Sequence, residues 1–193
     1  MRAGIVLAPS DASDMELLSQ LIGIQECQRL YGGSLKPFFG GESGAGLPSQ
    51  CLVARELVKR WLAEELAQRT VFANPEAVKD YLKLHFAGRE YESFVVLFLD
   101  AQNCLLEVEE LFRGTLTQTS VYPREVVKSA LRINAAGVMF SHNHPSGSVT
   151  PSRADEHLTQ TLKAALALVD VRVLDHLVIA GNSSLSFSET GLL

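Results

Sequence analysis

The chain has 193 residues, of which 47% are hydrophobic and 20% are charged, and its formal net charge is −5. This length allows one full domain with a small additional region and a substantial buried core. The negative charge argues against a nucleic-acid-binding protein, because such proteins usually have a basic face. A local basic patch is still compatible with this net charge. Three scattered cysteines without a Cys-x-x-Cys pair indicate reduced thiols rather than a disulfide framework.

No membrane or secretion signal is visible in the sequence. It lacks a cationic start followed by an apolar segment, and it has no apolar run near the length of a membrane-spanning helix. We therefore expect a cytoplasmic protein that does not associate with a membrane.

The first 70 residues predict a small helical region. Ser13 is a suitable N-cap for a helix over residues 14–22. The segment 31–48, with six glycines and two prolines, predicts a loop or linker. A phosphate-binding loop is disfavoured, because no lysine followed by Ser or Thr comes after the last glycine. A stronger helix is predicted over residues 52–67. Its buried stripe is expected to comprise Leu52, Leu57, Trp61 and Leu66.

From Asn74 onwards, predicted helices alternate with predicted strands. Asn74 and Pro75 are typical of a helix start, and the segment 115–121 predicts either an edge strand or a substrate-facing loop. Such alternation predicts an α/β domain. The expected strands are 93–99, 105–112, 136–140, 171–179 and 184–187, and the expected helices are 75–86, 123–132 and 155–169.

A group of metal-ligating side chains follows the predicted strand 136–140. His142 and His144 are two residues apart, so they can point to the same side of an extended chain, with Asn143 turned away. Asp155 comes eleven residues later, in the first turn of the next predicted helix. Two histidine nitrogens and one carboxylate oxygen are ligands of catalytic zinc, with water as the fourth. A capping box formed by Ser152 and Asp155 is an alternative that does not exclude metal binding.

These sequence motifs resemble those of a known protein family. The pattern His-x-His-Pro followed by Ser-x-x-Asp is similar to the JAMM (MPN-plus) metalloprotease motif, and Ser-His-Asn-His-Pro-Ser-Gly with Pro-Ser-Arg-Ala-Asp resembles the RadC family. The resemblance covers about residues 70–193. It implies a JAMM/MPN (cytidine-deaminase-like) mixed β-sheet flanked by helices over residues 71–193. It also implies a degenerate helix-hairpin-helix-like region over residues 1–70. Further matching segments are 92–100, 113–116, 123–125 and 174–177.

The resemblance assigns roles to two more residues. Glu92, at the start of the strand 93–99, matches the general base of the JAMM pattern, and Ser152 matches the group that hydrogen-bonds the developing oxyanion. Asp175 and His176 match a family landmark, for which we expect a structural role or support of the metal ligands. The remaining histidines, His85 and His157, are expected at the surface.

Three functions from different classes are compatible with this sequence. The first is a zinc-dependent hydrolase of amide bonds, a JAMM-type peptidase or isopeptidase with one zinc ion per chain and a protein or peptide substrate. The second is a DNA repair or recombination protein that binds DNA through its N-terminal region. The third is a metal-bound interaction module without catalysis. The sequence lacks the Pro-Cys-x-x-Cys of zinc deaminases and the His-Glu-x-x-His of zincins, and it does not define the oligomeric state.

Overall fold

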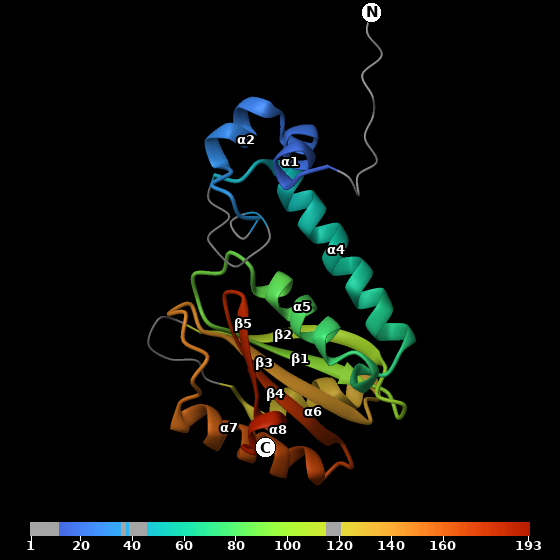
Figure 1. Ribbon diagram of the computed structural model, residues 1–193. Helices are drawn as coiled ribbons and strands as arrows, with labels where there is room; N and C mark the ends of the chain where they lie inside the picture. Colours follow the sequence, from blue (N-terminus) through green and yellow to red (C-terminus); the bar gives the residue numbers. More distant parts are fainter. Residues whose placement is uncertain (1–11, 36–37, 39–45, 115–120) are drawn as a thin grey trace, which may run out of the picture.

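A computed structural model describes residues 12–35, 38, 46–114 and 121–193. A group of short helices lies at one end of the molecule, and a long helix connects it to a β-sheet with helices on both faces (Figure 1). The expected α/β class, with a mixed sheet flanked by helices, is confirmed.

The N-terminal helices form a small core of their own. Helix α1 (Asp14–Ile22) begins with a capping box between Ser13 and Glu16, as its sequence predicts. Helix α2 (Ile24–Leu30), which the sequence analysis missed, follows at once, because Gly23 makes the turn with a φ of 84°. Half of the segment 31–48, which was predicted as a loop, lies outside the described residues. The buried residues of this core are Leu18, Ile22, Cys27, Phe38 and Cys51.

Helix α4 (Ser49–Gln68) exists as predicted, but its expected buried stripe is wrong. Leu52, Leu57 and Trp61 are 37%, 61% and 58% exposed, and only Leu66 is buried. A step of five residues turns the chain by about 140° around a helix of 3.6 residues per turn, so the four positions cannot share one face. The buried side of α4 consists instead of Cys51, Leu62 and Leu66.

Five strands form one sheet in the order β2-β1-β3-β4-β5. Strands β3 and β4 run parallel, and the other neighbours are antiparallel. The central strands β1 and β3 are buried along their whole length, which explains their nearly continuous apolar sequences. The strands are β1 (Ser93–Leu99), β2 (Leu105–Arg113), β3 (Gly137–Asn143), β4 (Arg172–Ala180) and β5 (Ser183–Ser186).

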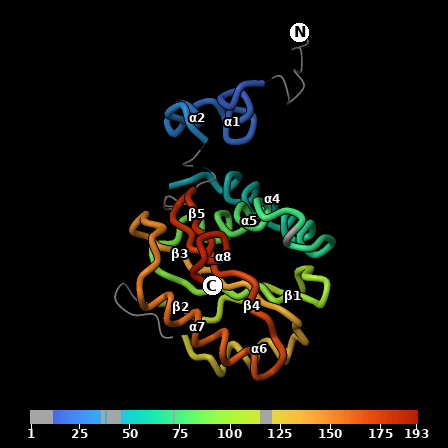
Figure 2. Tube along the Cα trace, turned by 60° about the horizontal axis from the view of Figure 1, so that its bottom comes forward, coloured from blue at the N-terminus to red at the C-terminus, as the bar shows by residue number. Residues whose placement is uncertain are grey.

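Helices cover both faces of this sheet (Figure 2). The short helix η2 (Val71–Ala73), α5 (Pro75–Phe86) and the C-terminal half of α4 pack on one face. On the other face lie α6 (Pro123–Ile133) and α7 (Arg153–Ala167). Alternate residues of β1 point to the two faces, so each layer has its own apolar core.

Most predicted boundaries agree with the structure to within two residues. Phe187 differs, because it begins the short helix α8 (Phe187–Thr190) instead of ending β5. The expectation for segment 115–121 falls almost entirely outside the described residues. The three cysteines are free thiols, and no described helix is long and apolar enough to cross a membrane.

Candidate metal centre

The three predicted metal ligands meet where β1, β3 and α7 adjoin. Because β1 and β3 are antiparallel, with Phe94 paired to His142, the start of β1 lies beside the end of β3. The first turn of α7 brings Asp155 to the same point. One ligand atom from each of His142, His144 and Asp155 lies within 4.8 Å of the others.

The distances between these atoms suit a zinc ion. The two histidine Nε2 atoms are 2.9 Å apart, and Asp155 Oδ1 lies 3.5 Å from Nε2 of His142. Asp155 Oδ2 lies 3.8 Å from Nε2 of His144. Ligands at usual zinc distances in a tetrahedral arrangement would be about 3.3–3.5 Å apart. The observed separations differ from these values by at most about 0.4 Å, which small side-chain movements can absorb, so the residues present fit this metal.

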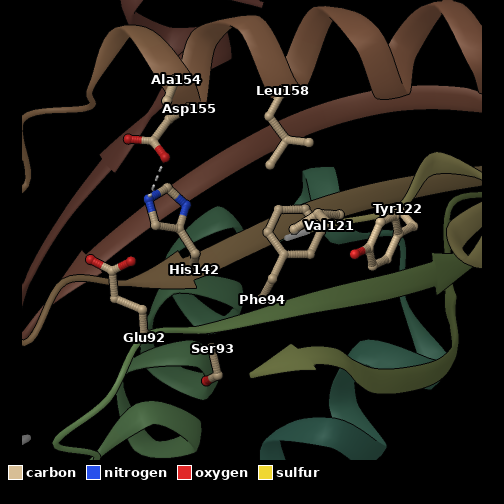
Figure 3. A pocket seen from close by; sticks show the side chains of 9 residues that line it. All are labelled: Glu92, Ser93, Phe94, Val121, Tyr122, His142, Ala154, Asp155 and Leu158. Carbon is tan, nitrogen blue, oxygen red and sulfur yellow. Dashed lines mark ion pairs between the residues drawn. The ribbon is translucent and has the colours of Figure 1, made fainter. Parts of the chain in front are cut away.

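Burial keeps His142 in the form that binds metals. It lowers the pKa of His142 to about 4, with Asp155 opposing and His144 reinforcing the shift. At neutral pH the ring is therefore uncharged and can act as a ligand. The contact between His142 and Asp155, drawn as a dashed line in Figure 3, then joins two ligand atoms rather than two opposite charges.

A buried chain of hydrogen bonds fixes which nitrogen of His142 carries the proton. The Thr159 hydroxyl donates to the backbone carbonyl of Asp155 (2.7 Å), so it must accept from Nδ1 of His176 (2.6 Å). The other nitrogen of His176, Nε2, then accepts from Nδ1 of His142 (2.8 Å). Nε2 of His142 then carries the lone pair of this ring, 2.9 Å from Nε2 of His144 and 3.5 Å from Oδ1 of Asp155.

The other ligands are oriented in similar ways. Nδ1 of His144 lies 2.8 Å from the carbonyl of Ser148, which can only accept, so Nε2 of His144 also keeps its lone pair. The backbone N–H and hydroxyl of Ser152 both donate to Oδ2 of Asp155 at 2.7 Å. These bonds hold the carboxylate with Oδ1 toward His142. Each ligand is thus oriented by a partner outside the metal position, as is usual in metal sites.

Comparison with known proteins identifies the family. A family model described as "RadC-like JAB domain" matches residues 72–192. The chain belongs to this family. Two similar relatives are both called "UPF0758 protein". The one from Polaromonas sp. (strain JS666 / ATCC BAA-500) is 52% identical over 96% of this chain and 91% of its own length. The one from Variovorax paradoxus (strain S110) is 54% identical over 92% and 79%. The predicted resemblance to RadC proteins is confirmed.

In this RadC-like domain, Glu92 lies close to the candidate ligands. It directly precedes β1, is partly buried, and lines the same cavity as His142 and Asp155 (Figure 3). Asn143 holds the chain on both sides of it. The Asn143 Oδ1 atom accepts from the Ser93 backbone N–H at 2.8 Å, and its Nδ2 atom donates to the Tyr91 carbonyl at 2.9 Å. The strand end that carries Glu92 is therefore fixed to the strand end that carries the histidines.

Ser152 occupies the N-cap of α7 and forms a capping box with Asp155. Its side chain is exposed, and its hydroxyl donates to the Asp155 carboxylate. Ser152 thus caps helix α7 and at the same time orients the carboxylate of Asp155. The role of Ser152 toward an oxyanion stays a prediction.

The cavity beside the candidate ligands has a volume of about 360 Å³. One end is polar and contains Glu92, His142 and Asp155, and the side chains at the other end are mainly apolar (Figure 3). Sequence reasoning missed the apolar end, because its residues come from three separate elements. They are Phe94, Val121, Tyr122 and Leu158.

The remaining polar residues have different positions. His176 contacts the candidate metal ligand His142. The buried Asp175 carboxylate accepts from the Ser186 hydroxyl and from the Ser188 N–H, which joins β4 to α8. His157 is exposed as expected. His85 was wrongly expected at the surface. It is partly buried near Arg89, and burial, followed by the charge of Arg89, lowers its pKa to about 3.

Proposed function

We propose that this RadC-like protein is a zinc-dependent hydrolase of amide bonds in proteins or peptides, a peptidase or isopeptidase. The grouping of two imidazole nitrogens and one carboxylate oxygen beside a cavity that Glu92, His142 and Asp155 line supports this proposal most directly. Zinc bound by His142, His144 and Asp155 would lower the pKa of its water ligand from about 16 to about 7.

Glu92 supplies the proton transfer in this proposal. Its carboxylate takes a proton from the attacking water and returns it to the leaving nitrogen. General acid–base catalysis of this kind typically contributes about 10²- to 10⁴-fold in rate. Asn143 positions Glu92 through the residues that precede and follow it. Ser152 orients Asp155, and the family resemblance assigns it the stabilisation of the oxyanion.

The test is a cleavage assay with the zinc-loaded protein. It would be incubated with a mixed peptide library and with lysine isopeptides, and new termini would be detected by mass spectrometry. We expect cleavage that stops on chelation and is lost in Glu92→Gln. The Glu90→Gln variant is the matched control, because Glu90 is an exposed neighbour.

Two results would contradict the proposal. Cleavage that persists undiminished in Glu92→Gln would exclude the assigned base. Tight zinc binding with no cleavage of any library member would favour a metal-bound interaction module.

A further inference from the structure

The cavity at the metal centre has an apolar end that the reaction itself does not require. Figure 3 shows the side chains of Phe94, Val121, Tyr122 and Leu158 gathered on one side, away from Glu92 and Asp155. These four residues are called the apolar end below. They come from β1, from the segment before α6, and from α7.

The floor of the apolar end is rigid. Phe94 is only 2% exposed, and its ring packs against the rings of Phe140 and Phe112, with centroids 5.5 Å and 6.5 Å away. Moving it would disturb the core between the sheet and helices α6 and α7. Tyr122 lies at the rim, 56% exposed, with its ring 6.0 Å from that of Phe112. The hollow is therefore preformed rather than created by ligand binding.

The chemistry of the walls selects against a charged occupant. No charged side chain belongs to the apolar end, among the part of the chain that the structure describes. A charged group placed there would lose water without gaining a partner. An acidic group would also approach the carboxylates of Glu92 and Asp155 at the polar end. An aliphatic or aromatic side chain meets neither cost and gains from leaving water.

We propose that the apolar end is a subsite for an aliphatic or aromatic side chain on the substrate residue that adjoins the scissile amide. This inference rests on the proposed function, because it places the amide at the polar end of the same cavity. The volume of about 360 Å³ lies at the small end of ligand-binding pockets. It suits a short peptide segment with one such side chain.

The test uses amino-acid hydroxamates, whose chelating group binds zinc while the side chain varies. Dissociation constants for the glycine, leucine, phenylalanine and aspartate hydroxamates would be measured by calorimetry on the zinc-loaded protein. We expect the leucine and phenylalanine compounds to bind at least about tenfold more tightly than the glycine compound, since even one methylene can contribute this much. The aspartate compound should bind more weakly than the leucine compound.

Substitutions in the apolar end test whether the affinity difference between the leucine and glycine compounds arises there. Leu158→Ser should reduce the ratio of leucine to glycine affinity, whereas Leu168→Ser, on an 87% exposed leucine at the end of the same helix, should not. Tyr122→Ser provides a second test on an exposed residue, which remains informative if Leu158→Ser fails to fold. Equal affinities of the glycine and leucine compounds for the wild-type protein would overturn the subsite and leave the metal centre intact.

A metal-free measurement separates the two proposals. N-acetyl-leucinamide should shift the methyl NMR signals of Val121 and Leu158, while N-acetyl-glycinamide should not. If the protein takes up no zinc, the proposed function fails, and this measurement alone decides the subsite. Identical responses to the two amides would overturn it.

Discussion

Replacing Thr159 with valine tests the hydrogen-bonded chain behind His142. Thr159 is fully buried, and valine has nearly the same size but no hydroxyl. His176 would then lose the acceptor of its Nδ1 proton, which lies 2.6 Å from the hydroxyl. An unsatisfied buried donor costs about 1–3 kcal/mol, so the free energy of unfolding of the metal-free protein should fall by about this amount.

The same substitution should weaken zinc binding. If His176 moves its proton to Nε2, it no longer accepts from Nδ1 of His142, and the His142 proton is then favoured on the metal-facing nitrogen. Loss of such a supporting partner typically lowers metal affinity by about 10- to 100-fold. On the usual scale of about 1.4 kcal/mol per tenfold change, this corresponds to about 1.4–2.8 kcal/mol.

Urea unfolding and competition with a chromophoric zinc chelator would measure the two effects. Thr159→Ser is the matched control. It loses a methyl group and some stability, but it keeps the hydroxyl and should keep the zinc affinity. Wild-type zinc affinity in Thr159→Val would refute the inferred direction of the hydrogen bonds.

Three further predictions concern α4, His85 and Asn143. Leu66→Ala should lower the free energy of unfolding, measured in urea, by about 2–5 kcal/mol, because Leu66 is buried. Trp61→Ala should change it by less than about 1 kcal/mol, because Trp61 is exposed. The reverse order would contradict the described orientation of α4. The folded-state pKa of His85, about 3, lies below its unfolded value of about 6.5. Its contribution to stability is therefore complete above pH 6.5 and is lost as the pH falls toward 3, by up to about 1.4 kcal/mol per unit. Urea unfolding between pH 7 and 5 should thus show a flatter profile for His85→Gln, and parallel profiles would exclude a buried neutral imidazole. Asn143→Ala removes the acceptor of the Ser93 N–H, so hydrogen exchange at that amide should accelerate; unchanged exchange would show that Asn143 does not anchor the strand.

The sheet was predictable from sequence mainly because its central strands β1 and β3 are buried on both faces. The segment Ser93–Leu99 is apolar in all residues after Ser93. Asn, Pro and Gly residues mark the ends of the neighbouring helices. The positions of His142 and His144 were also predictable, because residues two apart at a strand end point to the same side. Asp155 could be added because the capping pattern at Ser152 predicted where α7 begins.

The orientation of α4 was not predictable in the same way. Apolar residues occur on several sides of this helix, and periodicity alone does not show which side meets a partner. Val53, Leu57 and Trp61, at intervals of four, form the better apolar stripe, yet they are exposed. The sheet domain instead buries Leu62 and Leu66. Only the tertiary contacts decide between these faces.

The surroundings of the candidate metal centre depend on contacts between residues that are distant in sequence. His142 and His176 are 34 residues apart, and they meet because β3 and β4 pair in a particular parallel register. A shift of one residue would turn His176 to the opposite face. The family resemblance marked His176 as a landmark, but the sequence contained no signal for its bond to Thr159. The apolar end of the cavity has the same origin, since three elements contribute to it.

Zinc stoichiometry tests the central claim most directly. The purified chain would be stripped with a chelator, reloaded with zinc, desalted and analysed by mass spectrometry for metal content. We predict about one zinc ion per chain, loss of that zinc in His142→Ala and Asp155→Ala, and retention in His157→Ala, whose histidine is exposed nearby on α7. Failure of the wild-type chain to take up zinc, or equal zinc content in all three variants, would contradict the metal centre and the hydrolase built on it.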